Sequence, residues 1–343
     1  MAITAFWQET EDWHTAGEPF RIVQHLPTSS LDLGLSVAEQ RLLIMQTPGH
    51  PLDLLRQSLC HEPRGHADMY GCFITPPDDT GAQFGALFWH ADAFSTACGH
   101  GTIALGYWAI AHGLVKAKQD GVVDLMIDVP SGRVTARICC QNGKVAHVDF
   151  INIASYQIAK EVPLLVNIGA DSIHLNADLA FGGAVHACID VKSLGLKVEP
   201  KNYRRFMDIQ RQVKKQSAHF RHLDTYDVFG VIFFQHISDS DNTVTQKNVL
   251  VYGDGQIDRS PCGSGTASRV AILLAQGRMN GSKSLMNHSI LDTVFEATMD
   301  SVTQSPVEYP ACIARVRGHA NLVGRMKFYI DPADPVYPGF VFR

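Results

Sequence analysis

The sequence lacks the features that mark membrane-spanning, exported and nucleic-acid-binding proteins. No apolar run approaches the roughly 20 residues that a membrane-spanning helix needs. Residues 1–11 carry acidic side chains and no apolar core, so we expect no signal peptide and a cytoplasmic protein. The formal net charge is −5 and no basic stripe stands out, which argues against a nucleic-acid partner.

The cysteines lack the spacing of a metal site or of a disulfide framework. No two of them form a CxxC pair, and the chain of 343 residues is much longer than typical disulfide-stapled domains. We therefore expect no metal. Six of the eight cysteines are interpreted as small buried core residues. These are Cys60, Cys72, Cys139, Cys140, Cys188 and Cys312.

The composition indicates a folded protein with room for two domains. Hydrophobic residues make up 45% and charged residues 18% of the chain, which is typical of globular proteins. A chain of 343 residues is longer than one ordinary domain needs. Each half can therefore bury a core of useful size.

Three short segments of the first half return in the second half, in the same order and about half the chain length further on. Three such matches predict two related domains, residues 1–165 and 166–325, with a tail from about 326 to 343 that packs back on the first. Chance similarity among glycine-rich segments is the weaker explanation. The pairs are CGHGT at 98–102 with CGSGT at 262–266, DMYG at 68–71 with DVFG at 227–230, and HTAG at 14–17 with AFGG at 180–183.

Apolar and alternating runs predict a strand-rich α+β unit in each half. Gly132 and Gly143 mark hairpin turns. The predicted strands are Phe20–Val23, Gly71–Ile74, Gly85–His90, Val122–Ile127, Val134–Ile138, Val145–Ile151, Val231–Gln235 and Val249–Tyr252. The predicted helices are Val37–Thr47, Thr102–His112, Lys201–Ala218 and Thr266–Gln276.

Cys98 and Cys262 each stand before a predicted helix and are followed by glycines. A cysteine at a helix start faces unpaired backbone N–H groups and the positive end of the helix dipole, which lower the pKa of a thiol. We therefore interpret both as catalytic residues and expect both thiols to have lowered pKa values.

The backbone beside these cysteines is suited to binding a carboxylate. The amides of Gly99, His100, Gly263 and Ser264 lie at the two helix starts, where anions bind. Two such starts facing each other would hold one carboxylate and point two sulfur atoms at opposite faces of the neighbouring carbon. One thiolate would remove the Cα proton while the other thiol returns one, and the amides would stabilise the developing charge.

Other polar residues are candidates for contacts with the substrate. Asp258 precedes Cys262 by four residues and is predicted to bind the substrate's ammonium or ring nitrogen, with capping of a turn as the alternative. The side chain of His100 is a second candidate for that contact. His14, His66 and His90 are weaker candidates, since such histidines are more often structural.

The chain resembles the proline racemase superfamily, which includes proline racemases, hydroxyproline 2-epimerases and trans-3-hydroxy-L-proline dehydratases. The resemblance implies a diaminopimelate-epimerase-like fold, with two pseudo-symmetric α/β domains and the active site between them. It implies Cys98 and Cys262 as acid and base, Asp258 and the amides as substrate clamps, no cofactor, and a homodimer. The segments that carry it are 14–23, 62–71, 96–102 and 258–266.

The sequence leaves two enzyme activities of this superfamily open, and also a binding protein without catalytic activity. Dehydratases of the superfamily usually carry threonine at the second cysteine position, so Cys262 favours a racemase or epimerase acting on proline or a hydroxyproline. Segments 63–71 and 85–90 look more like the dehydratases, and many epimerases have a substrate-contacting histidine in the strand where this chain has Phe229-Gly230-Val231. A catalytically silent amino-acid-binding protein is the remote alternative.

Overall fold

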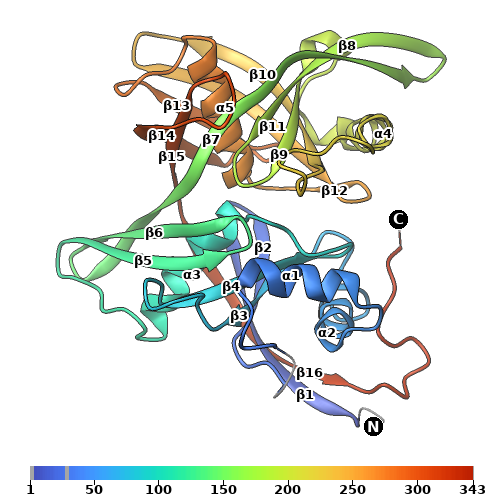
Figure 1. Cartoon of the computed structure of the whole chain (residues 1–343), viewed down its shortest axis with the longest axis vertical. Helices are drawn as coiled ribbons and strands as arrows, with labels where there is room; N and C mark the ends of the chain where they lie inside the picture. The colour runs from blue at the N-terminus through green and yellow to red at the C-terminus, as the bar shows by residue number, and fades with distance from the viewer. Residues whose placement is uncertain (1–3, 28–30, 343) are drawn as a thin grey trace.

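The protein consists of two α+β lobes that lie one above the other (Figure 1). The computed structural model describes residues 4–27 and 31–342. Residues 1–3 and 28–30, which belong to the predicted first domain, and residue 343, the last of the predicted tail, lie outside the described residues. The predicted boundary at 165/166 falls within one long strand, and it stays a prediction.

Both halves of the chain combine many strands with a few helices. The elements of the first half are β1 (Phe6–Thr15), β2 (Glu18–Val23), α1 (Val37–Gln46), α2 (Pro51–Cys60), β3 (Tyr70–Thr75), β4 (Phe84–His90), α3 (Gly99–Ala111), β5 (Gly121–Val129), β6 (Gly132–Gln141) and β7 (Lys144–Ile168). Those that follow are β8 (Asp171–Phe181), β9 (Val185–Asp190), α4 (Tyr203–Gln216), β10 (Val228–Asp239), β11 (Thr243–Tyr252), β12 (Gln256–Ile257), α5 (Gly263–Ala275), β13 (Ser284–His288), β14 (Val294–Thr303), β15 (Ala311–Gly318) and β16 (Ala320–Ile330).

The same order of strand pairings runs twice along the chain. In the first half, β1–β2 is antiparallel, β2–β3 parallel, β3–β4 antiparallel and β4–β5 parallel, and the β5–β6–β7 meander follows. In the second half, β8–β9, β9–β10, β10–β11, β11–β13 and β13–β14–β15 repeat these directions. Helices α3 and α5 occupy equivalent places, each before the second parallel pairing. The repeat seen in the sequence is therefore also a repeat of topology.

Two backbone connections join the lobes. Strand β7 is 25 residues long, and in Figure 1 it rises from the lower lobe into the upper one. Strand β15 pairs with β7, and β16 then pairs with β1 along its whole length. The C-terminal segment thus returns to the first half of the chain, and the lobes share one 16-stranded sheet.

The predicted elements all occur, and the sequence prediction missed helix α2 and several strands. Helix α2 has its N-cap at His50 and a proline at its first position, a combination that starts helices. Helices α3 and α5, which follow Cys98 and Cys262, start earlier than predicted, at Gly99 and Gly263. The reason is that the two cysteines themselves are the N-caps. Their glycine-rich first turns conceal the helical pattern, since glycine disfavours helices in general.

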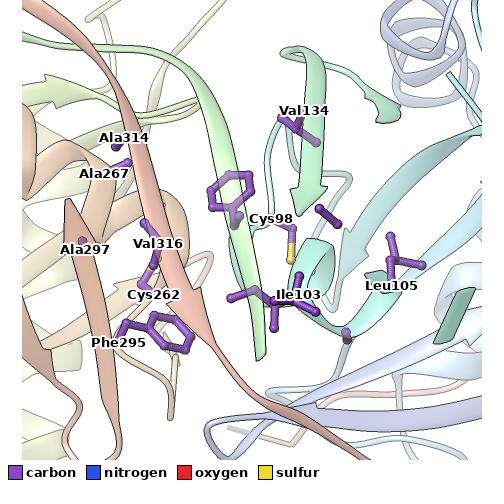
Figure 2. Close-up of a cluster of buried hydrophobic side chains, with 14 of the residues drawn as sticks. Cys98, Ile103, Leu105, Val134, Cys262, Ala267, Phe295, Ala297, Ala314 and Val316 are labelled. Atoms are coloured by element: carbon purple, nitrogen blue, oxygen red, sulfur yellow. The ribbon is translucent and has the colours of Figure 1, made fainter. Parts of the chain in front are cut away.

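One buried cluster of apolar side chains runs continuously from one lobe into the other. It includes Ile103 and Leu105 of α3, Ala267 of α5, and both Cys98 and Cys262 (Figure 2). The two cysteines are each 4% exposed. The candidate site therefore lies inside the core that joins the lobes, where charged groups are costly and hydrogen bonds strong.

A buried ion pair links β1 to β2, and its arginine also reaches the end of α2 and the segment that follows it. Arg21 donates to both carboxylate oxygens of Asp12, at 2.9 and 2.8 Å, and also to the carbonyl oxygens of Leu59 and Arg64. We expect Asp12→Ala to lower the free energy of unfolding by about 3–5 kcal/mol, because it leaves the guanidinium buried without a counter-ion. Urea denaturation measures this loss.

The control is Glu9→Ala on the same strand. Glu9 faces Lys327 at 3.4 Å, but both side chains are more than half exposed, so solvent screens the pair. An equally small loss in both variants would show that the buried pair contributes no more than the surface one.

Candidate active site

The first turns of α3 and α5 are in direct contact. A Cβ atom placed on Gly99 would lie 2.5 Å from the Cα of Gly263, and one on Gly263 would lie 2.5 Å from the Cα of Gly99. Real Cβ atoms do not approach so closely, so both positions require glycine. The amides that open the two helices have no acceptor within their helices. Two anion-binding helix starts are thus brought to one place.

Cys98 caps the start of α3 with its sulfur atom. The Sγ atom accepts a hydrogen bond from the Gly101 amide at 3.2 Å. It also lies 3.5 Å from Nδ1 of His100. Burial lowers the pKa of His100 to about 3, so the imidazole is neutral. The thiol therefore has one backbone donor and one uncharged ring beside it.

Cys262 caps the start of α5 in the same way. Its Sγ atom accepts from the Gly265 amide at 3.2 Å and lies 3.6 Å from Oγ of Ser264. Its φ angle is +61°, a strained conformation for a residue other than glycine. The preceding carbonyl of Pro261 accepts from Asn248, which holds this turn in place.

The expectation of lowered thiol pKa values is wrong for this closed structure. Burial raises the pKa of Cys98 and Cys262 well above the ordinary value, and the hydrogen bonds from Gly101 and Gly265 only partly oppose it. Nearby Asp258 raises both further. The helix start does act on the sulfur atoms as predicted, but desolvation of the thiolate outweighs it.

Asp258 lies in the same buried site and is 3% exposed. It accepts a hydrogen bond from the Ser260 amide at 2.7 Å. Burial raises the pKa of Asp258 to about 6, with hydrogen bonds from Ser260 limiting the rise. One oxygen therefore caps a turn while the side chain lines the cavity, and the contact with a substrate nitrogen stays a prediction.

Two acids of the first half hold the segment that contains Asp258. Oε2 of Glu18 accepts from the Arg259 amide at 2.7 Å. Asp68 accepts from the Ile257 amide at 3.3 Å and pairs with the Arg259 guanidinium at 2.7 Å. The lobes are therefore clamped together on either side of Asp258.

The structure places all the predicted site residues around one cavity of about 20 Å³. This is space for about one water molecule. The site residues predicted from the sequence that line it are Cys98, Gly99, His100, Asp258, Cys262, Gly263 and Ser264.

The remaining wall of the cavity consists of residues that were not among the predicted site residues. Tyr70, Phe229, Tyr252, Leu250 and Ala97 complete it. The repeat carried a signal for the first two, since Tyr70 and Phe229 occupy the same place in the matched segments 68–71 and 227–230. Nothing in the sequence marked Tyr252.

The weaker histidine candidates do not line this cavity. His90 packs behind the wall, with its ring centroid 5.3 Å from Tyr252 and 5.9 Å from Phe229. His14 and His66 accept from the amides of Gly17 and Asp68 at 3.3 and 3.2 Å. The structural role expected for these histidines stays a prediction.

One group of metal-type ligands lies elsewhere, on β6 and β7. It consists of Cys139, His147 and Asp149. Arg317 donates to both carboxylate oxygens of Asp149, at 2.8 and 3.3 Å, so a cation would have to displace a guanidinium. This group shares no residue with the cavity, and the expectation that the protein uses neither metal nor cofactor stays a prediction.

Comparison with known proteins decides the family. A sequence model described as proline racemase matches residues 11–341. The chain belongs to the proline racemase family. Membership in the family fits the two capped helix starts and the shared cavity.

Relatives in this family carry two different names. A trans-3-hydroxy-L-proline dehydratase of Bacillus thuringiensis is 36% identical, with 97% of each chain covered. A proline racemase of Acetoanaerobium sticklandii is 31% identical, with 96% of each chain covered. The superfamily assignment from the sequence motifs is confirmed.

Solved structures confirm the predicted fold. A hydroxyproline epimerase from Agrobacterium vitis, crystallised with trans-4-hydroxy-L-proline, superposes with a TM-score of 0.85 at 24% identity and covers 98% of this chain and 96% of its own. The family fold is therefore α+β with two similar lobes, as expected. Within residues 4–27 and 31–342, no helix is both long and apolar enough to cross a membrane.

The raised thiol pKa values predict a specific pH dependence of stability. In the unfolded chain the thiols ionise near pH 8.5, whereas burial keeps Cys98 and Cys262 protonated at that pH. The unfolded state then binds fewer protons, so the free energy of unfolding falls as pH rises. We expect a Cys98→Ala/Cys262→Ala variant to lose less stability between about pH 8 and pH 10 than the wild type, by up to about 1.4 kcal/mol per thiol and pH unit.

Urea unfolding at the two pH values measures this difference. Cys139→Ala is the control, because that thiol is only partly buried and should change the pH dependence less. Parallel losses in wild type and double variant would contradict the raised pKa values.

Proposed function

We propose that this enzyme of the proline racemase family inverts the α-carbon of proline or a hydroxyproline without a cofactor, with Cys98 and Cys262 as the two acid–base groups. The observation that carries this proposal is the pairing of two sulfur-capped helix starts around one buried cavity. One start alone would bind an anion. Two starts in contact supply a second sulfur for the opposite face of the same substrate.

The helix starts would hold the substrate carboxylate. The amides of Gly99, His100, Gly263 and Ser264 face a site with little water, where hydrogen bonds to a developing enolate are strong. The Cα–H is a weak acid, so stabilising this charge is the main requirement. A buried thiolate is also a stronger base than an exposed one, because its conjugate thiol has a raised pKa.

Asp258 would bind the ring nitrogen. Its carboxylate lies in the same cavity as both sulfur atoms, and an ammonium beside it would favour its ionised form. The Asp258 carboxylate then pairs with the positive charge on the substrate nitrogen, the amides bind the substrate carboxylate, and one thiolate removes the Cα proton. Since the closed cavity holds about one water molecule, a substrate must enter by separation of the lobes and release of the Asp68–Arg259 clamp.

Dehydration of trans-3-hydroxy-L-proline is the second candidate. The relative of that name is 36% identical, against 31% for the named proline racemase. Both reactions start with removal of the Cα proton, and they differ in whether the second face is protonated or the 3-hydroxyl leaves. Cys262 favours inversion because it supplies the second proton donor.

The homodimer and the cytoplasmic location predicted from the sequence remain part of this proposal. The partner that the proposal does require is a small-molecule amino acid.

Proton NMR in deuterium oxide tests the reaction. With proline and the 3- and 4-hydroxyprolines, the wild type is expected to place deuterium at Cα and to form the opposite Cα epimer. Cys98→Ala and Cys262→Ala should each lower the inversion rate by at least about 100-fold, the usual contribution of a general acid or base. Cys139→Ala, outside the cavity, serves as the cysteine control.

The same experiment separates inversion from dehydration. A dehydratase would release a ketimine from trans-3-hydroxy-L-proline, which o-aminobenzaldehyde detects. Full turnover of that substrate by Cys262→Ala would overturn the two-base mechanism. A binding protein without catalytic activity would show neither deuterium exchange nor ketimine.

The raised pKa of Asp258 predicts how kcat/KM depends on pH on the acidic side of the profile, which is called the acidic limb here. Because burial raises its pKa to about 6, the free enzyme carries the carboxylate above that pH and the neutral acid below it. We expect kcat/KM to fall as pH drops below about 6, since the neutral acid cannot pair with an ammonium. Asp258→Asn should raise KM strongly and remove this limb, and a wild-type kcat/KM that is flat down to about pH 4 would exclude the role.

A further inference from the structure

A second and larger cavity lies between the lobes, next to the candidate active site. Its volume is about 600 Å³, against about 20 Å³ for the cavity that contains the two cysteines. Helix α1 and the end of β4 line it from the lower lobe of Figure 1, and helix α4 and the start of β10 line it from the upper lobe. The residues that define this interlobe cavity are Arg41, Met45 and His90 of the first lobe and Lys214, Phe229 and Asp254 of the second.

One side chain separates the interlobe cavity from the active-site cavity. Phe229 lines both cavities and is only half-buried. His90 lines the interlobe cavity and packs edge-on against Phe229, with ring centroids 5.9 Å apart. A ligand in the interlobe cavity would therefore lie next to the reacting site without occupying it.

Most of the cationic side chains in the interlobe cavity lack an acidic partner. Two arginines and two lysines line it, and among the described residues only one of them, Arg211, forms an ion pair, with Asp254 at 3.0 Å and Asp208 at 3.8 Å. The ammonium of Lys214 reaches one carbonyl oxygen, that of Gly253, at 3.5 Å. Cationic groups that are partly removed from water and lack a counter-ion favour the binding of an anion.

Arg41 faces Lys214 from the other lobe and is also incompletely paired. Its Nε donates to the carbonyl oxygen of Phe94 at 2.8 Å, and its guanidinium forms no ion pair among the described residues. Burial lowers the pKa of Arg41, and the nearby acid Asp227, which is exposed, opposes this shift. Four of the five guanidinium N–H donors are thus left for a ligand.

The other polar groups of the interlobe cavity leave this positive charge in place. Asp254 is paired with Arg211, and the Asp92 carboxylate accepts from the Asp254 amide at 2.7 Å. Burial lowers the pKa of His90 to about 3, and the charge of Lys214 contributes to this shift. The ring of His90 is therefore neutral, and the ammonium of Lys214 lies close to it.

We infer that the interlobe cavity is a second ligand site, which binds a small carboxylic acid with an apolar body between Arg41 of the first lobe and Lys214 of the second. The guanidinium and ammonium donors suit a carboxylate, and Met45 and Phe229 offer apolar surface to the rest of the ligand. The bound acid contacts both lobes only when they are closed, so it stabilises the closed arrangement. Because the proposed substrate enters by separation of the lobes, the acid inhibits Cα–H exchange. The site goes beyond the proposed function, and only the inhibition rests on it.

Benzoate tests the site directly. It combines a carboxylate with an apolar ring, and it has no Cα–H bond to exchange. Calorimetry measures its Kd for the wild type, Lys214→Met and Arg41→Met. We expect each substitution to raise this Kd at least about tenfold, because it removes a charge-assisted hydrogen bond. Benzamide, which has the same shape without the charge, should bind the wild type at least about tenfold more weakly than benzoate.

Two control variants locate the bound benzoate. Lys144→Met removes the same charge from an exposed position at the start of β7, outside the cavity, and should leave the Kd unchanged. Asp258→Asn should also leave it unchanged, whereas benzoate held by the helix starts of the active site would bind more tightly without that carboxylate. An unchanged Kd in Lys214→Met and Arg41→Met, or tighter binding to Asp258→Asn, would overturn the inference. Thermal unfolding verifies that all the variants fold.

The inhibition is measured separately. In the proton NMR assay of Cα–H exchange, benzoate should slow the wild type, and it should inhibit Lys214→Met at least about tenfold more weakly while the rate without benzoate stays the same. Equal inhibition of both proteins would overturn the inference. If the wild type exchanges no Cα proton of any substrate, the proposed function fails, and the calorimetry still decides whether the second site exists.

Discussion

The contact between the starts of α3 and α5 is the constraint on which the rest of the site depends. Gly99 and Gly263 approach so closely that neither position has space for a Cβ atom. This contact joins two helix ends whose free amides attract negative charge. It also fixes the sulfur atoms that cap them, so the spacing of the proposed acid and base is set by backbone packing.

The lobes are joined by two kinds of contact. Strands β7 and β15–β16 link the lobes through hydrogen-bonded pairings. Around the cavity the link is made by side chains instead, chiefly Glu18 and Asp68 on either side of Asp258. A few hydrogen bonds and one ion pair can break and re-form, whereas an extensive strand pairing cannot do so easily.

Burial determines the protonation of the site. It raises the pKa of both thiols, of Glu18 and of Asp258, and it lowers that of His100. All these shifts favour neutral groups, because a low-dielectric interior penalises charge of either sign. A zwitterionic substrate brings one charge of each sign and so supplies the counter-charges that this closed interior lacks.

The sequence by itself determined the repeat, the α+β class, the helices after Cys98 and Cys262, and the residues of the proposed carboxylate site. These follow from local patterns, since a glycine-flanked cysteine before an apolar helix has the same properties wherever it lies in the chain. The tertiary structure decided the rest: the contact between Gly99 and Gly263, the clamp on Asp258, the interlobe cavity, and the raised thiol pKa values that reversed the expectation from the helix starts. Each depends on contacts between residues far apart in the chain and on how much water the packed lobes exclude. A local sequence pattern contains no information on either of these.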